Sequence, residues 1–254
     1  MKPVAADSLR RARGCFVTGT DTGVGKTLVS AALAAALREQ GLDVGVMKLV
    51  ETGWPESATI PSDAHRLRTA AGVSETVEQI CPYRFPAPLA PLAAARAAGC
   101  QIEMPVLMEA FRRLADRHAY MIVEGVGGLL VPVTETLDVS DVLVQLGLPA
   151  IVVGRAALGG VNHACLTLDA LKARNVPILA LVLNRAAGEG SSMQTDSTYA
   201  LLAERCRVPV LGPLPYEPLL AGDWPKGVAA ISRQPAIRSL VSLVNEARFS
   251  ETRR

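Results

Sequence analysis

The stretch from Gly19 to Thr27 contains the residues whose types and spacing best suit chemistry on an anion. It reads Gly-Thr-Asp-Thr-Gly-Val-Gly-Lys-Thr. Glycines let backbone N–H groups approach an anion closely, Lys26 can reach terminal phosphates, and the hydroxyl of Thr27 can bind Mg²⁺. The usual pattern, G-x-x-x-x-G-K-[ST], is not fully met, because Thr20 stands where its first glycine belongs and Gly19 comes one residue earlier. The stretch predicts a binding loop for a nucleoside triphosphate.

The segments around this loop must place it between a strand and a helix. Residues 15–18 form a short apolar run before it, and residues 28–40, rich in alanine and leucine, follow it. A strand, a glycine loop and a helix N-terminus together suit phosphate, because the helix end adds partial positive charge to the loop N–H groups. The alternative is a chance glycine turn, and the position of Gly-Lys-Thr at the junction of strand and helix argues against it.

Lys48 is a second cation that the predicted fold brings to the same edge. Residues 44–49 read as a buried strand after a helix that ends near Gly41. In an open parallel sheet, ligands bind outside the carboxyl ends of the strands, which is also where the glycine loop lies. Lys48 is therefore a candidate to face the same phosphates as Lys26, although a solvated lysine at a strand end fits this position equally well.

Two carboxylates, Asp63 and Glu124, are candidate metal ligands. Glu124 ends an apolar strand at residues 120–123, the usual context of an acid that meets the Mg²⁺ of a phosphate loop. Bracing the glycine turn that follows is its weaker alternative role. Asp63 precedes a helix at residues 64–71, where it could cap the helix or help to bind Mg²⁺, and spacing does not decide between the two roles.

The rest of the chain alternates predicted strands and helices. We expect helices near residues 105–117, 138–146, 161–174, 199–207 and 237–247, strands near 150–153, 176–183 and 208–211, a loop at 51–62, and a proline-rich ordered loop or lid at 81–91. This alternation predicts an α/β fold: a single P-loop NTPase-like domain over residues 14–254, with a mostly parallel sheet and helices on both faces. We expect residues 1–13 to be a disordered tail.

The composition argues against several classes of protein. A formal net charge of +2 gives no support for nucleic-acid binding, and no apolar run is long enough for a membrane span. The five cysteines show no C-x-x-C spacing and the three histidines are scattered, so neither a zinc site nor a Ser-His-Asp arrangement is indicated. With no signal-peptide core at the N-terminus, these features predict a cytoplasmic protein with reduced thiols.

Three motifs, in order along the chain, resemble those of the dethiobiotin synthetase family. They are the loop with its preceding strand (residues 17–27), Val-Glu-Gly-Val-Gly-Gly (123–128) and Leu-Gly-Gly-Val-Asn-His-Ala (158–164). The lengthened loop that begins Gly-Thr-Asp-Thr is the most specific, and the resemblance covers about residues 14–216. The resemblance implies a homodimeric, ATP-dependent carbon–nitrogen ligase of biotin biosynthesis, which uses Mg²⁺ and closes a ureido ring from 7,8-diaminopelargonate and CO₂. The implied intermediates are a carbamate and a carbamic-phosphoric anhydride.

The resemblance also implies roles for residues at matching positions. The implied catalytic residues are Thr22, Lys26 and Lys48, and the implied Mg²⁺ ligands are Thr27, Asp63 and Glu124. The implied ATP-binding residues are Thr20, Asp21, Gly23, Val24, Gly25, Lys26 and Thr27 in the loop, with Asn184, Pro213, Leu214 and Pro215 at the purine. The implied substrate residues are Thr52, Gly127, Gly159 and Asn162, the last two at the end of a helix that receives the substrate carboxylate across a dimer interface.

One departure and two alternatives bear on this interpretation. Leu49 follows Lys48 where the family often has proline, so the loop that carries Thr52 could take a different path. A related P-loop amidoligase, or a kinase acting on another carboxylate or amine, would share the same loop. The other alternative is a non-catalytic, partition-type ATP switch. Such proteins generally carry a further lysine early in the loop, where this chain has Thr20 and Asp21.

Overall fold

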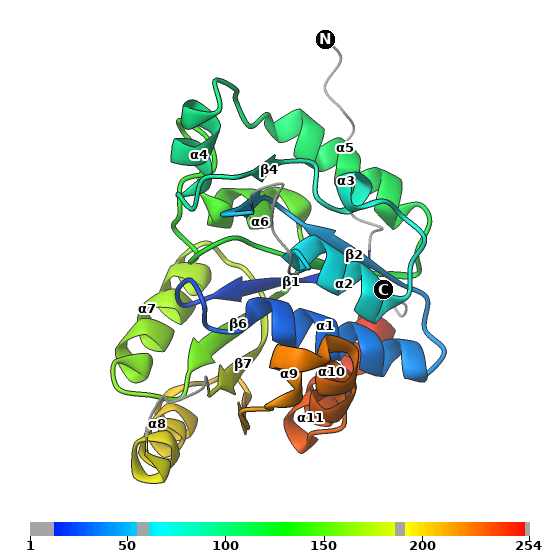
Figure 1. Ribbon diagram of the computed structural model, residues 1–254. Coiled ribbons are helices and arrows are strands. Elements are labelled where there is room, and N and C mark those ends of the chain that lie inside the picture. The colour runs from blue at the N-terminus through cyan, green and yellow to red at the C-terminus, as the bar shows by residue number, and fades with distance from the viewer. Residues whose placement is uncertain (1–12, 55–60, 186–190, 252–254) are drawn as a thin grey trace.

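The central feature of the fold is a six-stranded parallel sheet with the strand order β2-β5-β1-β6-β7-β8 (Figure 1). The computed structural model describes residues 13–54, 61–185 and 191–251. Strand β1 (Gly14–Gly19) lies between β5 (Tyr120–Glu124) and β6 (Ala150–Arg155) and is parallel to both. The loops that follow these three strands therefore meet at one edge of the sheet, where the strand order changes direction.

The remaining elements complete the sheet and cover it. The other strands are β2 (Val44–Lys48), β7 (Ile178–Asn184) and β8 (Val210–Leu214), with a separate parallel pair formed by β3 (Glu51–Thr52) and β4 (Arg84–Phe85). The helices are α1 (Lys26–Glu39), α2 (Asp63–Ala71), α3 (Val77–Ile80), α4 (Pro91–Ala97), α5 (Met104–Ala115), α6 (Val139–Leu146), α7 (Gly160–Ala173), α8 (Ser192–Arg205), α9 (Leu219–Gly222), α10 (Trp224–Ser232) and α11 (Pro235–Glu251).

Two apolar cores lie on opposite faces of the sheet. Along β1, Cys15 and Val17 belong to one core and Phe16 to the other, as expected for a strand whose successive side chains point to opposite faces. The first core packs buried residues of α1, α2, α10 and α11 against the sheet, and the second packs those of α4 to α8 (Figure 1). The predicted mostly parallel sheet with helices on both faces is therefore confirmed.

Several local predictions are wrong. The predicted loops at 51–62 and 81–91 contain the paired strands β3 and β4, which are only two residues each and give no alternating pattern. The helix predicted from residue 199 begins at Ser192, because Ser191 caps it by accepting from the N–H of Gln194. Helices α3, α4, α9 and α10 were not predicted, and they have four, seven, four and nine residues.

Parts of the predicted tail and of one predicted loop are not among the described residues. The predicted tail at 1–13 lies, except for Arg13, outside the described residues, as do residues 55–60 of the predicted 51–62 loop. Within the described ranges, no helix combines the length and apolar character needed to cross a membrane.

Candidate active site

The loop between β1 and α1 has the geometry that its glycines predict. Gly25 is the N-cap of α1 with φ of 102°, a left-handed conformation that suits glycine. A Cβ at this position would lie 2.2 Å from Nδ2 of Asn184, so a larger residue would displace that side chain. Asn184 ends β7, and its Nδ2 donates to the carbonyl oxygen of Val24 at 3.0 Å. The loop is thus fastened to a strand two places away in the sheet.

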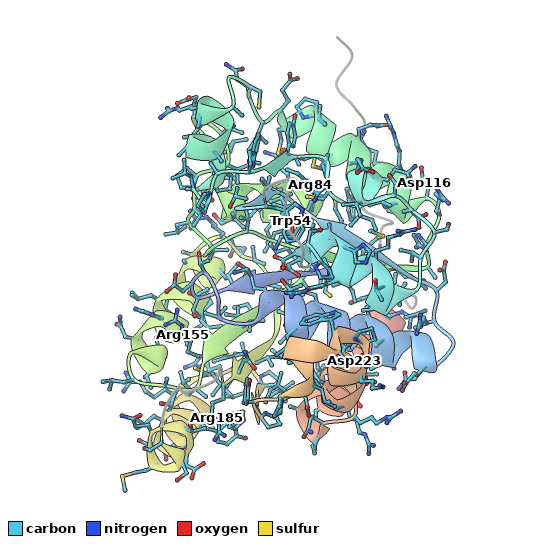
Figure 2. All side chains as sticks on the ribbon, viewed as in Figure 1. Trp54, Arg84, Asp116, Arg155, Arg185 and Asp223 are labelled. Atoms are coloured by element: carbon cyan, nitrogen blue, oxygen red, sulfur yellow. The ribbon has the colours of Figure 1, made fainter. Side chains whose placement is uncertain are left out.

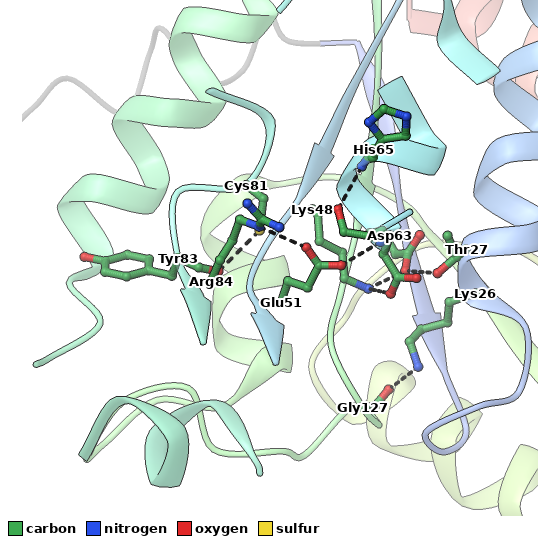
Figure 3. A network of polar contacts seen from close by, with 12 residues as sticks. Lys26, Thr27, Lys48, Glu51, Asp63, His65, Cys81, Tyr83, Arg84 and Gly127 are labelled. Carbon is green, nitrogen blue, oxygen red and sulfur yellow. Dashed lines mark hydrogen bonds and ion pairs between the residues drawn. The ribbon is translucent and has the colours of Figure 1, made fainter. Parts of the chain in front are cut away.

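Lys26 links the loop to the turn after β5. Its Nζ donates to the carbonyl oxygen of Gly127 at 2.7 Å (Figure 3) and to that of Asp21 at 3.0 Å. Burial, followed by the nearby charge of Lys48, lowers the pKa of Lys26 to about 8. Because neutral carbonyls are weaker partners for an ammonium group than a charged oxygen, a phosphate is well suited to take their place.

Lys48 and Glu124 form the buried charged centre of the site. They are register partners on the adjacent strands β2 and β5, and Lys48 Nζ lies 2.5 Å from Glu124 Oε1. Both side chains are almost fully buried, at 5% and 0% exposed. Burial alone would lower the pKa of Lys48, but the carboxylates of Glu124 and Asp63 outweigh it and hold this pKa above its usual range. Lys48 therefore stays charged at neutral pH.

Asp63 joins this centre from the start of α2. Its Oδ2 accepts from Lys48 Nζ at 2.9 Å. Burial would raise the pKa of Asp63, but the charge and hydrogen bond of Lys48 outweigh that effect and lower it. Asp63 is not the N-cap of α2: Ser62 is, because the Ser62 side chain accepts from the N–H of His65. Asp63 is the first helical residue instead, and its side chain faces the site.

The donor atoms around Lys48 suit Mg²⁺. Thr27 donates its hydroxyl to Glu124 Oε1 at 2.8 Å, and Glu124 Oε2 is buried with no partner among the described residues. Mg²⁺ prefers oxygen ligands and usually binds one or two carboxylates while keeping water and phosphate oxygens. Within the described ranges, no group of three or more His, Cys, Asp and Glu side chains forms a metal cage of its own. The oxygens of Thr27, Asp63 and Glu124 thus fit a Mg²⁺ ion whose other ligands are water and nucleotide phosphate oxygens.

The residues expected at the purine lie together at the end of the sheet. Asn184 and Leu214 are register partners on β7 and β8, and Pro213 and Pro215 flank Leu214 in the chain. The Oδ1 atom of Asn184 is buried and has no hydrogen-bond donor among the described residues. An amide acceptor in this position is free to receive an N–H group of a base.

The expected substrate residues fall into separate groups. Gly127 contacts Lys26, as described above, and Thr52 lies half-buried on β3, next to Glu51. Gly159 is the N-cap of α7, and Asn162 lies exposed in its first turn. The start of α7 is therefore at the surface, and not within the charged cluster around Lys48.

The structure adds residues that the motifs did not identify. Glu51 is buried between Arg84 and the backbone of Asp63, and Arg155 Nη2 lies 3.4 Å from Oδ2 of Asp21 and 3.3 Å from the carbonyl oxygen of Thr22. Figure 2 labels Arg84 near β4 and Arg155 near the end of β6. Arg84 lies within the predicted loop at 81–91, and Arg155 lies two residues after the strand predicted at 150–153. These positions were the available indication in the sequence.

The chain is similar to known enzymes over most of its length. A family model described as an AAA domain matches residues 13–223. A protein from Anaeromyxobacter dehalogenans (strain 2CP-C), named ATP-dependent dethiobiotin synthetase BioD, is 50% identical over 82% of this chain and 92% of its own length. Proteins of the same name from Bacillus licheniformis and Thermodesulfovibrio yellowstonii are 40% and 37% identical, each over 80% of this chain and over 86% and 88% of their own lengths.

Solved structures share the architecture at low sequence identity. The cell division protein MinD of Aquifex aeolicus is 14% identical with a TM-score of 0.54, and covers 93% of this chain and 97% of its own. McdA from Cyanthece, solved in its apo form, is 15% identical with a TM-score of 0.53, over 92% and 98% of the two chains. Identities this low show a shared fold alone, so they do not favour the partition-type alternative.

Proposed function

The chain belongs to the ATP-dependent dethiobiotin synthetase family, and from this premise we propose how its residues act. It is an ATP-dependent ligase that closes the ureido ring of dethiobiotin in biotin biosynthesis. The proposed substrates are 7,8-diaminopelargonate, CO₂ and ATP, with Mg²⁺ as cofactor. The observation that supports this assignment most strongly is the contact of Lys48 with Glu124, which itself accepts from the loop residue Thr27.

The proposed reaction has three bond-forming steps. One amine of the diamine attacks CO₂ and loses a proton, which gives a carbamate. A carbamate oxygen then attacks the γ-phosphorus of ATP, ADP leaves, and a carbamic-phosphoric anhydride forms. The second amine attacks the carbonyl carbon of the anhydride and loses a proton, and inorganic phosphate leaves as the ring closes. Negative charge is created or moved in every step, so catalysis by positioned cations is sufficient and a covalent protein nucleophile is not required.

We assign the two lysines to the negative charges of the phosphates and of the carbamate. Lys26 exchanges its carbonyl partners, Asp21 and Gly127, for phosphate oxygens of ATP. Lys48 is assigned to the γ-phosphate and the carbamate, because it contacts Glu124, which itself accepts from the loop residue Thr27. Thr22, with the other loop residues Thr20, Asp21, Gly23, Val24 and Gly25, completes the phosphate-binding backbone.

Mg²⁺ is assigned to Thr27, Asp63 and Glu124, where it would neutralise phosphate charge. Each of these side chains presents an oxygen to the same small region, as their shared contacts with Lys48 and with one another indicate. Lys48 supplies positive charge to the two carboxylates in the present arrangement. With a metal ion bound to those carboxylates, Lys48 would be free to interact with the γ-phosphate and the carbamate.

The nucleotide base and the diamine are assigned to opposite ends of the site. Asn184, with Pro213, Leu214 and Pro215, holds the purine, supported by the buried acceptor atom of Asn184. Thr52 offers its hydroxyl to the diamine. Gly127, whose carbonyl oxygen accepts from Lys26, is assigned to the same substrate. The substrate carboxylate is assigned to the start of α7, where Gly159 and Asn162 present helix N–H groups and an amide.

A homodimer would bring that helix end to the active site of a second subunit. Leu158 and Leu166, before and within α7, are 88% and 62% exposed, and burial of their apolar surface in an interface would stabilise a dimer. The carboxylate held at one active site would then contact Asn162 of the partner subunit. We further infer that the enzyme acts in the cytoplasm, where ATP is available and thiols stay reduced.

The test of this function is a reaction with omissions. Purified protein with ATP and Mg²⁺ should release ADP only when both 7,8-diaminopelargonate and bicarbonate are present, and ¹³C-bicarbonate should label the ring carbonyl of the product. Other diamines, amino acids and carboxylates form the comparison panel. ADP release that depends on one of those compounds, and not on the diamine with bicarbonate, would favour a related amidoligase or kinase instead.

A further inference from the structure

Glu51 is a buried carboxylate that the proposed chemistry does not use. It lies on β3, three residues after Lys48, and is 5% exposed. A buried carboxylate is costly unless its oxygens are paired, and both oxygens of Glu51 have a partner. Oε1 accepts from the backbone N–H of Asp63 at 2.6 Å, and Oε2 accepts from Nε of Arg84 at 3.2 Å (Figure 3).

The contact with Asp63 fixes the first residue of α2. The first N–H groups of a helix have no partner within the helix, and a carboxylate near them is favoured by the helix dipole. Ser62 caps the N–H of His65, and Glu51 takes the N–H of Asp63. The backbone of the proposed metal ligand is therefore held from outside its own helix.

The contact with Arg84 fixes the strand that carries Thr52. Glu51 and Arg84 are register partners in the β3–β4 pair, and the N–H of Glu51 donates to the carbonyl oxygen of Tyr83 at 2.9 Å. The side-chain bond therefore reinforces a pair of strands with only two residues each. Thr52, the residue assigned to the diamine, is the next residue on β3.

We propose that Glu51 is a positioning residue that sets Asp63 and Thr52 at a fixed separation. One of its oxygens holds the metal-binding side of the site and the other holds the diamine-binding side. The inference rests on the proposed function, because it takes the roles of Asp63 and Thr52 from there. Partners of metal ligands typically change metal affinity by about 10-fold to 100-fold when removed, even though they do not touch the metal.

The two oxygens allow the two effects to be separated. Glu51→Ala removes both contacts and should weaken Mn²⁺ binding to the ADP complex about 10-fold, measured by electron paramagnetic resonance, and should also raise the KM for the diamine. Arg84→Ala leaves the contact with Asp63 in place, so the diamine KM should rise while Mn²⁺ affinity stays within about twofold of wild type. ADP affinity without a metal should be unchanged in both variants.

A matched control uses the other carboxylate near Arg84. Glu78 Oε1 lies 4.0 Å from Arg84 Nη1, and its side chain is 75% exposed. Glu78→Ala removes a negative charge from the same arginine without touching Asp63, so Mn²⁺ affinity and the diamine KM should both match wild type. Glu51→Met keeps about the size of the side chain without either acceptor oxygen, and serves as the second variant if Glu51→Ala does not fold.

Whether Glu51 acts on Mn²⁺ affinity through Asp63 is tested in the Asp63→Asn variant. Glu51→Ala should add less than about a twofold loss of Mn²⁺ affinity there, because its target is already impaired. The inference is overturned if Glu51→Ala and Glu51→Met bind Mn²⁺ as wild type does. It is also overturned if they weaken metal-free ADP binding as much as Mn²⁺ binding, which indicates a general loss of structure. If wild-type protein binds Mn²⁺ and ADP but does not close the ring, the proposed function fails, and the Mn²⁺ series alone decides the role of Glu51.

Discussion

Lys48 and Glu124 face each other across the adjacent strands β2 and β5, with Nζ 2.5 Å from Oε1 in the most buried part of the site. The carboxylate also accepts from Thr27 of the phosphate loop at 2.8 Å, so one side chain connects the loop to a second lysine. This connection depends on the strand order, which places β5 between β1 and β2. The sheet thus brings together charges that lie far apart in the sequence.

Loss of the Glu124 charge should raise the Mg²⁺ requirement. Glu124→Gln keeps the shape of the side chain but removes a proposed metal ligand, so the Mg²⁺ concentration for half-maximal activity should rise by about tenfold or more. Thermal melting shows whether the variant remains folded, and Glu135→Gln, an exposed surface change, is the control. An unchanged Mg²⁺ titration would leave Glu124 with only a structural role in the turn after β5.

Removal of the loop lysine should abolish most turnover. In Lys26→Ala the phosphoryl group loses a positioned cation, and kcat should fall by about 10²-fold to 10³-fold, as measured by ADP release. Lys226→Ala is a suitable control, because that lysine is 75% exposed and its ion pair is with Asp223, three residues earlier. Activity close to wild type in Lys26→Ala would contradict the role assigned to Lys26.

Nucleotide affinity should depend on pH through Lys26. Burial lowers the pKa of this lysine to about 8, whereas the carboxylates around Lys48 hold the pKa of that lysine above its usual range. Below pH 8, Lys26 is already protonated and affinity should be constant. Above pH 8, phosphate binding requires uptake of a proton, so ADP affinity should fall by up to about tenfold per pH unit.

Calorimetry measures this proton uptake directly. Titrations at pH 7 and pH 9, in buffers of different ionisation enthalpy, should show uptake at pH 9 and almost none at pH 7. Lys26→Arg keeps its charge throughout this range, so its remaining ADP affinity should be independent of pH. Equal uptake at both pH values in the wild type would exclude Lys26 as the titrating group.

The exposed start of α7 should be required for dimerisation. Leu166→Glu places a charge on the proposed interface, and light scattering should then report a monomer where the wild type forms a dimer. The diamine KM should rise, because Asn162 of the partner subunit would be absent, while ADP affinity should not change. Val106→Glu alters an exposed residue of α5, a helix that lies away from α7 (Figure 1), and should leave the dimer intact.

Much of the site could be predicted because it depends on strand ends. The lysine at the end of β2 and the carboxylate at the end of β5 were both expected at the ligand edge, and the structure places them in contact. The three motifs also identified the family, which the relatives confirm. Strand ends can be read from local sequence, because apolar runs and glycine turns are local signals.

Other parts of the site depend on contacts between distant residues. Glu51 meets partners that are 12 and 33 positions away, and nothing in the local pattern indicates either contact. Ser62 and Asp63 are both favourable cap residues, so sequence alone could not assign the cap to Ser62. Leu49 also has an unforeseen contact: its N–H donates to the carbonyl oxygen of Glu124 at 2.9 Å, a bond that proline cannot make.

The central claim is that metal, phosphate and substrate meet where Lys48 now contacts Glu124 and Asp63. A crystal structure with Mn²⁺, a non-hydrolysable ATP analogue and 7,8-diaminopelargonate tests it most directly, through the anomalous signal of the metal. We predict one Mn²⁺ peak bound by oxygens of Thr27, Asp63 and Glu124, with Lys48 turned toward the γ-phosphate. A metal bound elsewhere, with Lys48 still between Glu124 and Asp63, would contradict the claim.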